Sequence, residues 1–184
     1  QIKRKRGRLA QHSNGLLSRY RAHHFIEHKL PGLLPGRGVM EARFGPANEP
    51  LIILLVHLGL GKRARLRQLE YIGELINRYQ HVIIMGDFNC TAQSEEIDTL
   101  LNKTHQCAPV DNLHTYPSRQ PVQNIDHIIV TPGIGIKDVQ VLDSTTSDHL
   151  PIMVEISVPD HIARYWHERY SNSAPPSQRR PDKL

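Results

Sequence analysis

The segment that decides the fold is HVIIMGDFN, residues 81–89. Its first five residues form a short, mostly apolar run, which is typical of a strand covered on both faces. Gly86 follows, and glycine lets the backbone turn sharply or approach a neighbour. Alternation in an extended segment would direct Asp87 and Asn89 to one side and Phe88 to the other. The sequence therefore predicts a buried strand that ends in an acid and an amide.

A second buried strand and a helix precede this segment. Residues 51–56 are continuously apolar, and His57 stands at the end of that run. Between the two strands, residues 64–79 carry apolar side chains at helical spacing, namely Leu66, Leu69, Ile72, Leu75 and Ile76. A strand, helix, strand unit with short connections indicates layered α/β packing.

Further strands are predicted from shorter patterns at residues 14–20, 38–44, 125–130 and 151–158. No internal repeat or second composition block is present. We therefore expect one domain over residues 12–162. A basic leader over residues 1–11 and a polar, basic tail over residues 163–184 are expected to be unstructured.

Composition indicates a globular protein with an anionic partner. The chain has 184 residues, of which 39% are hydrophobic and 22% charged, and a formal net charge of +5. A basic domain most commonly meets nucleic acid, although much of this excess lies in the terminal runs 3–8 and 179–180, and terminal charge runs are usually solvated.

The cysteine content and the hydropathy of the chain indicate its cellular location. Cys90 and Cys107 are too few for a disulfide framework and lack the paired spacing of a zinc site, which favours a reducing compartment. The most apolar run, residues 51–60, is about half the roughly 20 residues that a membrane span needs. We expect a cytoplasmic monomer without a transmembrane segment.

The polar residues at the strand ends are the candidates for chemistry. Asp87 and Asn89 are suited to orient a water and to bind a phosphate oxygen, and strand ends are where α/β proteins build their sites. The alternative is a turn stabilised by Asx hydrogen bonds. Asp148 and His149 put a carboxylate suited to Mg²⁺ beside a side chain that exchanges protons near neutrality; the alternative is a surface loop.

Asp126 and His57 complete the candidate set. Asp126 begins the predicted strand 125–130, where burial would be costly without a partner. Pairing with His149 would orient that ring and stabilise its protonated form, whereas an isolated capping role is the alternative. His57, at the end of its strand, is by itself more typical of a structural histidine. Four strand ends that each carry a suitable polar residue favour one shared site.

The motifs, taken in order, resemble the endonuclease/exonuclease/phosphatase superfamily, which includes pancreatic deoxyribonuclease. Gly86-Asp87-Phe88-Asn89 followed by Ser147-Asp148-His149-Leu150-Pro151 is a specific combination, with His57-Leu58 before it and Ile125-Asp126-His127-Ile128 between. The resemblance runs from about residue 14 to residue 158 and implies a four-layer α/β sandwich, with two mixed sheets face to face and helices outside.

The resemblance also implies roles for individual residues. Asp87 would align the attacking water, Asn89 and His57 would hold the phosphate, and His149 with Asp126 would stabilise the transition state. Asp148 would help to bind Mg²⁺ or Mn²⁺, with Asp87 as a second candidate ligand. Arg19 would lie near the phosphate. The connection 115–122 would contribute a wall of the pocket.

One departure from the family pattern concerns the amino-terminal part. Family members begin with a strand that bears an Asn ligand and, after a helix, a Glu that is the main metal carboxylate. Residues 1–11 are too short and too basic to hold these elements. The sequence is therefore interpreted as a member that lacks its first strands and this Glu, which would weaken metal binding severely without erasing the phosphate pocket.

The predicted function is a Mg²⁺-dependent phosphoester hydrolase that acts on phosphodiesters by in-line attack of water. Nucleic acid is the favoured substrate on charge grounds. A phospholipid or phosphoinositide phosphohydrolase of the same superfamily is the alternative within this chemistry. A non-catalytic domain that binds a phosphate-bearing ligand is the alternative from another class.

Overall fold

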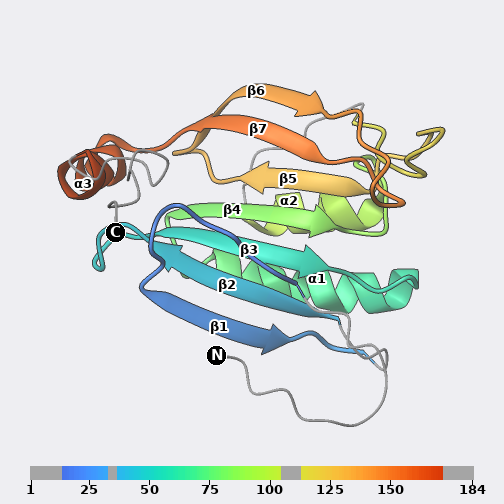
Figure 1. Ribbon diagram of the computed structural model, residues 1–184. Helices are drawn as coiled ribbons and strands as arrows, with labels where there is room; N and C mark the ends of the chain where they lie inside the picture. Colours follow the sequence, from blue (N-terminus) through green and yellow to red (C-terminus); the bar gives the residue numbers. More distant parts are fainter. Residues whose placement is uncertain (1–13, 33–36, 105–112, 172–184) are drawn as a thin grey trace, which may run out of the picture.

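The computed structural model describes residues 14–32, 37–104 and 113–171. Within these ranges a five-stranded mixed sheet has the order β1-β2-β3-β4-β5 (Figure 1). The strands are β1 (His24–Lys29), β2 (Gly38–Phe44), β3 (Leu51–His57), β4 (His81–Asp87) and β5 (Asp126–Val130). Neighbours run antiparallel except β3 and β4, which are parallel because helix α1 (Lys62–Ile76) carries the chain back between them.

Alternating side chains of β3 and β4 enter two separate cores. On one face, Ile52, Leu54 and Ile84 pack with α1 and with α2 (Glu95–Thr104). On the other face, Leu51 and Ile83 belong to a core that includes the second sheet. Both central strands are therefore covered on both faces, which explains their continuous apolar sequence.

The second sheet consists of β6 (Gly135–Val141) and β7 (Ile152–Ser157), paired antiparallel. It faces the larger sheet on the side opposite α1 and α2, and helix α3 (Asp160–Tyr170) lies beyond its end (Figure 1). The predicted fold class, an α/β sandwich of two sheets flanked by helices, is confirmed. None of the helices in the described ranges is both long enough and apolar enough to cross a membrane.

Two sequence predictions about the ends of the domain are wrong. Residues 14–20 form no strand; instead the Asn14 side chain donates to the Leu55 carbonyl at 3.0 Å, and the Tyr20 ring stacks on Trp166 of α3. The unstructured tail expected from residue 163 does not begin there, because α3 continues to Tyr170 and buries Ile162 completely. The predicted leader 1–11 and the rest of the tail lie outside the described residues.

The elements that the sequence patterns missed have weak apolar periodicity. Strand β1 is an edge strand whose side chains are exposed or half-buried, so polar residues fill most of it. Strand β6 likewise alternates between exposed and half-buried positions. Helices α2 and α3 are short and mostly polar, and each packs through a few buried side chains such as Ile97 and Ile162.

Candidate functional site

Strand register places three of the candidate residues side by side. His57 at the end of β3 is aligned with Asp87 at the end of β4, and Asp87 is aligned with Asp126 at the start of β5. The His57 Nε2 atom lies 3.4 Å from Asp87 Oδ2. Parallel pairing of β3 with β4 and antiparallel pairing of β4 with β5 thus bring these side chains to one edge of the sheet.

The turn after β4 fixes Asp87. Gly86 has φ +140°, and a Cβ there would lie 2.0 Å from the Val56 carbonyl oxygen, so a side chain is excluded. Phe88 is fully buried, and Asn89 adopts a left-handed φ of 53°. The backbone N–H of Asn89 donates to Asp87 Oδ1 at 2.8 Å. The Asx-type turn that competed with a catalytic interpretation is therefore present, and it orients the carboxylate at the strand end.

The amide of Asn89 links two strand ends. Its Nδ2 donates to the Leu58 carbonyl at 2.9 Å and to Asp87 Oδ2 at 3.2 Å. Asn89 thus ties the segment after β3 to the carboxylate after β4. Asp87 and Asn89 thus lie together, although Asn89 has a left-handed φ of 53° rather than the extended backbone that the prediction assumed.

Asp126 pairs with His149, and this contact decides between the pairing and the isolated capping role that the sequence left open. The His149 Nδ1 atom lies 2.7 Å from Asp126 Oδ2, and the Thr115 hydroxyl donates to the same oxygen. The Tyr116 ring contacts the imidazole with a centroid separation of 4.8 Å. The connection 115–122 therefore contributes to the wall of the site, as predicted, although its sequence did not indicate that Thr115 and Tyr116 make the contacts.

Asp148 and His149 reach the site from a loop rather than from a strand. Residues 145–149 form turns and bends, and β7 begins only at Ile152. Ser118 holds this loop, because its N–H donates to the Asp148 carbonyl at 2.7 Å and its hydroxyl donates to the Ser147 carbonyl at 2.6 Å. The loop keeps Asp148 exposed while His149 is half-buried.

Two groups in the site, Asp87 and His149, have raised pKa values. Burial, assisted by the negative charge of Asp126, raises the pKa of the Asp87 carboxyl above its usual value, although the Asn89 N–H and the nearby histidines oppose this shift. Burial disfavours the imidazolium of His149, but the hydrogen bond and charge of Asp126 outweigh it and raise the pKa of His149. The site therefore combines a half-buried carboxylate base with a histidine that holds its proton to higher pH.

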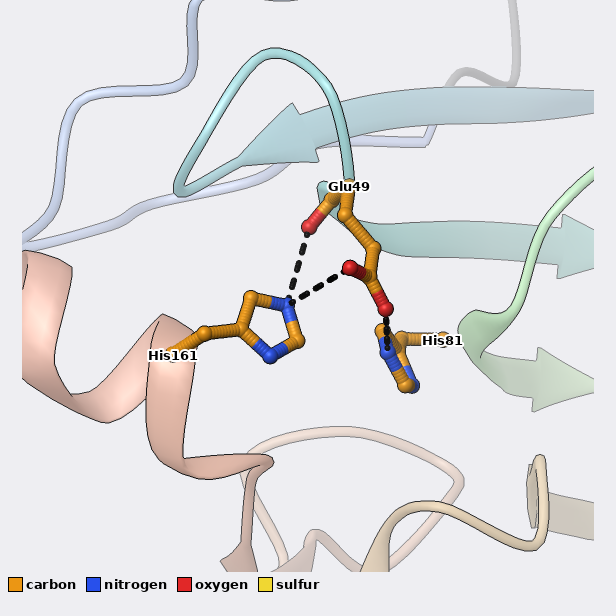
Figure 2. A group of neighbouring side chains, drawn as sticks. All are labelled: Glu49, His81 and His161. Atoms are coloured by element: carbon orange, nitrogen blue, oxygen red, sulfur yellow. Dashed lines mark hydrogen bonds and ion pairs between the residues drawn. The ribbon is translucent and has the colours of Figure 1, made fainter.

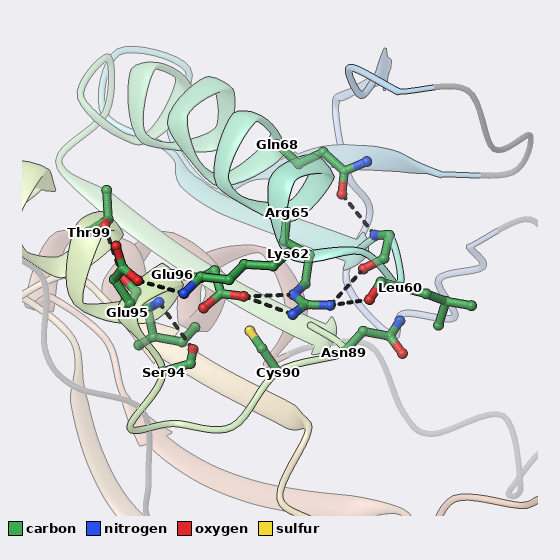
Figure 3. A network of polar contacts seen from close by, with 12 residues as sticks. Leu60, Lys62, Arg65, Gln68, Asn89, Cys90, Ser94, Glu95, Glu96 and Thr99 are labelled. Atoms are coloured by element: carbon green, nitrogen blue, oxygen red, sulfur yellow. Dashed lines mark hydrogen bonds and ion pairs between the residues drawn. The ribbon is translucent and has the colours of Figure 1, made fainter.

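A polar network braces the loops that follow β3 and β4 (Figure 3). Arg65 donates to the Leu60 carbonyl at 2.5 Å and forms an ion pair with Glu96 at 2.8 Å. Gln68 accepts the N–H of Gly59 at 2.8 Å. Arg65 thereby joins the first turns of α1 and α2 directly, and Arg65 and Gln68 tie α1 to the loop that follows His57.

Arg19 is the predicted phosphate ligand that the structure does not bring to the other site residues. It lines a cavity with Trp166 and His167 of α3. This is the end of the molecule opposite Asp87, and the neighbouring Arg21 N–H donates to the Tyr170 hydroxyl there. Because residues 14–20 form no strand, the chain leaves the sheet and follows α3. Arg19 therefore lies apart from the other predicted site residues.

The donor atoms at this edge suit a hard divalent cation. Asp87 and Asp148 offer carboxylate oxygens, and Mg²⁺ is usually held by one or two carboxylates together with waters and substrate phosphate. Asp148 is exposed, and one of its oxygens accepts a hydrogen bond from Ser147 at 3.1 Å. The carboxylates of Asp87 and Asp148 are therefore ligands of the chemical type that such an ion prefers.

Comparison with solved structures supports the fold. A mannosyl-6-phosphatase of Bacteroides thetaiotaomicron VPI-5482 superposes with a TM-score of 0.64 at 20% identity, covering 75% of this chain and 67% of that chain. The catalytic domain of human Nocturnin with bound sulfate gives a TM-score of 0.61 at 17% identity, covering 76% of this chain and 60% of that chain.

Comparison of sequences extends this likeness. A UPF0294 protein of Erwinia tasmaniensis is 27% identical over 161 residues, which are 82% of this chain and 59% of that protein. The chain thus spans less than two thirds of the length of this curated relative. The model of the Endonuclease/Exonuclease/phosphatase family, whose members hydrolyse phosphoester bonds, matches residues 4–149. Because this match includes the strand ends and loops that build the site, the chain belongs to the endonuclease/exonuclease/phosphatase family.

Proposed function

We propose that the site at the β3, β4 and β5 ends catalyses divalent-metal-dependent hydrolysis of phosphoesters by in-line attack of a water. The observation that carries this proposal is the row of His57, Asp87 and Asp126 in direct register, with His149 hydrogen-bonded to Asp126. Asp126 thus connects a base and an imidazolium donor, the two kinds of group that phosphoryl transfer to water uses.

Asp87 serves as the residue that aligns the water and accepts its proton. Its carboxylate is held by the Asn89 N–H, and burial raises its pKa toward the range of a useful base. His57 and Asn89 hold the phosphate. For Asn89, the longer of its two side-chain bonds, at 3.2 Å to Asp87, is the one exchanged for a phosphate oxygen.

His149 stabilises the charge that develops on the phosphoryl oxygens. The Nδ1 atom of His149 is hydrogen-bonded to Asp126, so the Nε2 atom is the one that would contact the substrate. The carboxylate also raises the pKa of His149 and so favours the imidazolium form, in which Nε2 donates to oxygen. Asp126 is therefore a positioning residue that acts through His149.

Asp148, with Asp87 as the second candidate, would hold Mg²⁺ or Mn²⁺. When bound, such an ion supplies Lewis-acid polarisation of the phosphoryl oxygens.

Nucleic acid is the substrate we favour, because a formal net charge of +5 favours an anionic partner. A phosphatase among the solved structures of the same fold makes phosphomonoesters a second class to assay. Phospholipid and phosphoinositide head groups form the third class.

The experiment compares three substrate classes with and without Mg²⁺: plasmid DNA and RNA, a sugar phosphate, and phosphoinositide vesicles. The variant Asp87→Ala removes the base, and Asp143→Asn is the matched control, since it changes an exposed acid that we place in no site. We expect Mg²⁺-stimulated hydrolysis that is lost in Asp87→Ala and kept in Asp143→Asn. Equal activity of both variants, or phosphate-ligand binding without hydrolysis in any class, would favour a non-catalytic domain.

A further inference from the structure

A second cluster of ligand-type side chains lies at the other end of β4. Glu49, His81 and His161 offer one carboxylate and two imidazoles, and their ligand atoms all lie within 4.8 Å of one another (Figure 2). His81 is the first residue of β4 and Asp87 is its last. At about 3.3 Å per residue the two sites are roughly 20 Å apart, so this cluster is not part of the site described above.

Three separate segments build the cluster. Leu51 pairs in register with His81, which brings the preceding Glu49 alongside that ring. His161 comes from the first turn of α3, which is held in place because Ile162 is fully buried and lies against Gly45. The cluster thus joins the turn between β2 and β3, the start of β4 and the carboxy-terminal helix.

The two histidines direct one nitrogen each at Glu49. His81 Nε2 lies 2.9 Å from Glu49 Oε1, and His161 Nε2 lies 3.8 Å from Glu49 Oε2 and 3.3 Å from the Glu49 carbonyl oxygen. The other nitrogen of His81 is enclosed, because a Cβ at Gly133 would lie 3.0 Å from it. Packing therefore presents the Nε2 atom of His81 to the cluster.

We propose that Glu49, His81 and His161 form a second divalent-metal site, suited to Zn²⁺, that clamps α3 to the sheet. Two imidazoles and a carboxylate are a donor set that Zn²⁺ accepts, whereas Mg²⁺ prefers oxygen ligands alone. A tetrahedral Zn²⁺ needs ligand atoms about 3.4 Å apart. One ligand atom from each of the three residues lies within 4.8 Å of the others, so small side-chain rotations bring them to that spacing.

The cluster can adjust to an ion and leaves room for a further ligand. The side chains of Glu49 and His161 are 39% and 37% exposed to solvent, so both can rotate at little cost. A cavity of about 280 Å³ borders these two residues and is lined also by Arg164, Tyr165 and Glu168. A water can complete the coordination from that side, as in three-ligand zinc sites.

The test measures Zn²⁺ affinity and Zn²⁺-dependent thermal stability of the full chain after removal of metals by a chelator. We expect Zn²⁺ to raise the melting temperature with increasing concentration, and Mg²⁺ not to do so through this site. Loss of an outer-shell partner of a metal ligand already costs about 10- to 100-fold in affinity. His161→Ala and Glu49→Gln should therefore weaken Zn²⁺ binding at least about tenfold and remove the stabilisation.

Two controls separate this site from others. His167→Ala removes a histidine from the same helix outside the cluster and should keep the Zn²⁺ effect. Asp148→Asn changes the site at the opposite end of β4 and should also keep it. Unchanged Zn²⁺ affinity in both His161→Ala and Glu49→Gln, or no stabilisation of the unaltered protein by Zn²⁺, would overturn the proposal and leave a hydrogen-bonded triad.

Discussion

The two ends of strand β4 carry different chemistry on one scaffold. At its carboxyl end, Asp87 is surrounded by Asn89, Asp126 and His149, with oxygen donors and an exposed loop. At its amino end, His81 meets Glu49 and His161, with two imidazoles around one carboxylate. The strand supplies rigid spacing in both cases, and the loops that meet it decide which ligands gather.

The comparison teaches why a sequence motif identified one end and not the other. At the carboxyl end, His57 and Asp87 end buried strands and Asp126 begins one, so apolar runs point to them. At the amino end, Glu49 lies in a turn and His161 in a polar helix, 112 residues apart. Only the docking of α3 brings them together.

The largest expected effect is on catalysis. His149→Ala should lower the turnover of Mg²⁺-dependent hydrolysis by about 10²- to 10⁴-fold, the range for a lost acid or base group. His167→Ala, which removes an exposed histidine of α3, should leave turnover within twofold. Steady-state kinetics on the preferred substrate provide the check. An equal loss of turnover in the two variants would contradict the assignment of catalysis to the carboxyl end of β4.

The next effect concerns stability at the two ends. Gly86→Ala should destabilise the fold by about 3 kcal/mol or more, because its φ is +140° and the new Cβ would meet the Val56 carbonyl oxygen. Gly133→Ala, beside the His81 side chain at 3.0 Å, should cost about 1 kcal/mol since a side chain can shift. Urea denaturation measures the free energy of unfolding of both variants. A larger loss of stability for Gly133→Ala than for Gly86→Ala would contradict this prediction.

A pH experiment sharpens the role of Asp126. The pKa of His149 is raised in the folded state, so its protonated form and the stability it contributes are present below the unfolded pKa and are lost as pH rises through the folded pKa. Asp126→Asn removes the partner charge and should move the alkaline limb of the pH–rate profile to lower pH. A profile that does not move would mean that Asp126 has no influence on the titrating group.

The smallest effect is a gain in stability. The raised pKa of Asp87 means that its charged form is disfavoured by folding, which costs stability above the unfolded pKa and costs nothing at lower pH. Asp87→Asn should therefore raise the melting temperature at pH 7 by about 2–4 °C while it abolishes hydrolysis. The gain should disappear at pH 3, and thermal melts at both values test it.

Prediction from sequence succeeded where burial shapes the pattern. The strands around Ile53 and Ile83 and the helix around Ile72 are covered on their apolar faces, so hydropathy alone located them. It failed for β1, β6 and α3, whose polar or half-buried side chains leave little periodicity. Arg19 was misplaced for a related reason, because Tyr20 packs on Trp166 and draws the segment away from the sheet.

The amino-acid sequence by itself determined the central strands, the helix between them and the polar residues at their ends, because these depend on local periodicity and on a specific motif. Tertiary structure alone decided that His149 reaches Asp126 through a loop held by Ser118, and that Glu49, His81 and His161 meet. Such contacts arise from strand register and helix docking between distant segments, and no local pattern in the chain encodes them.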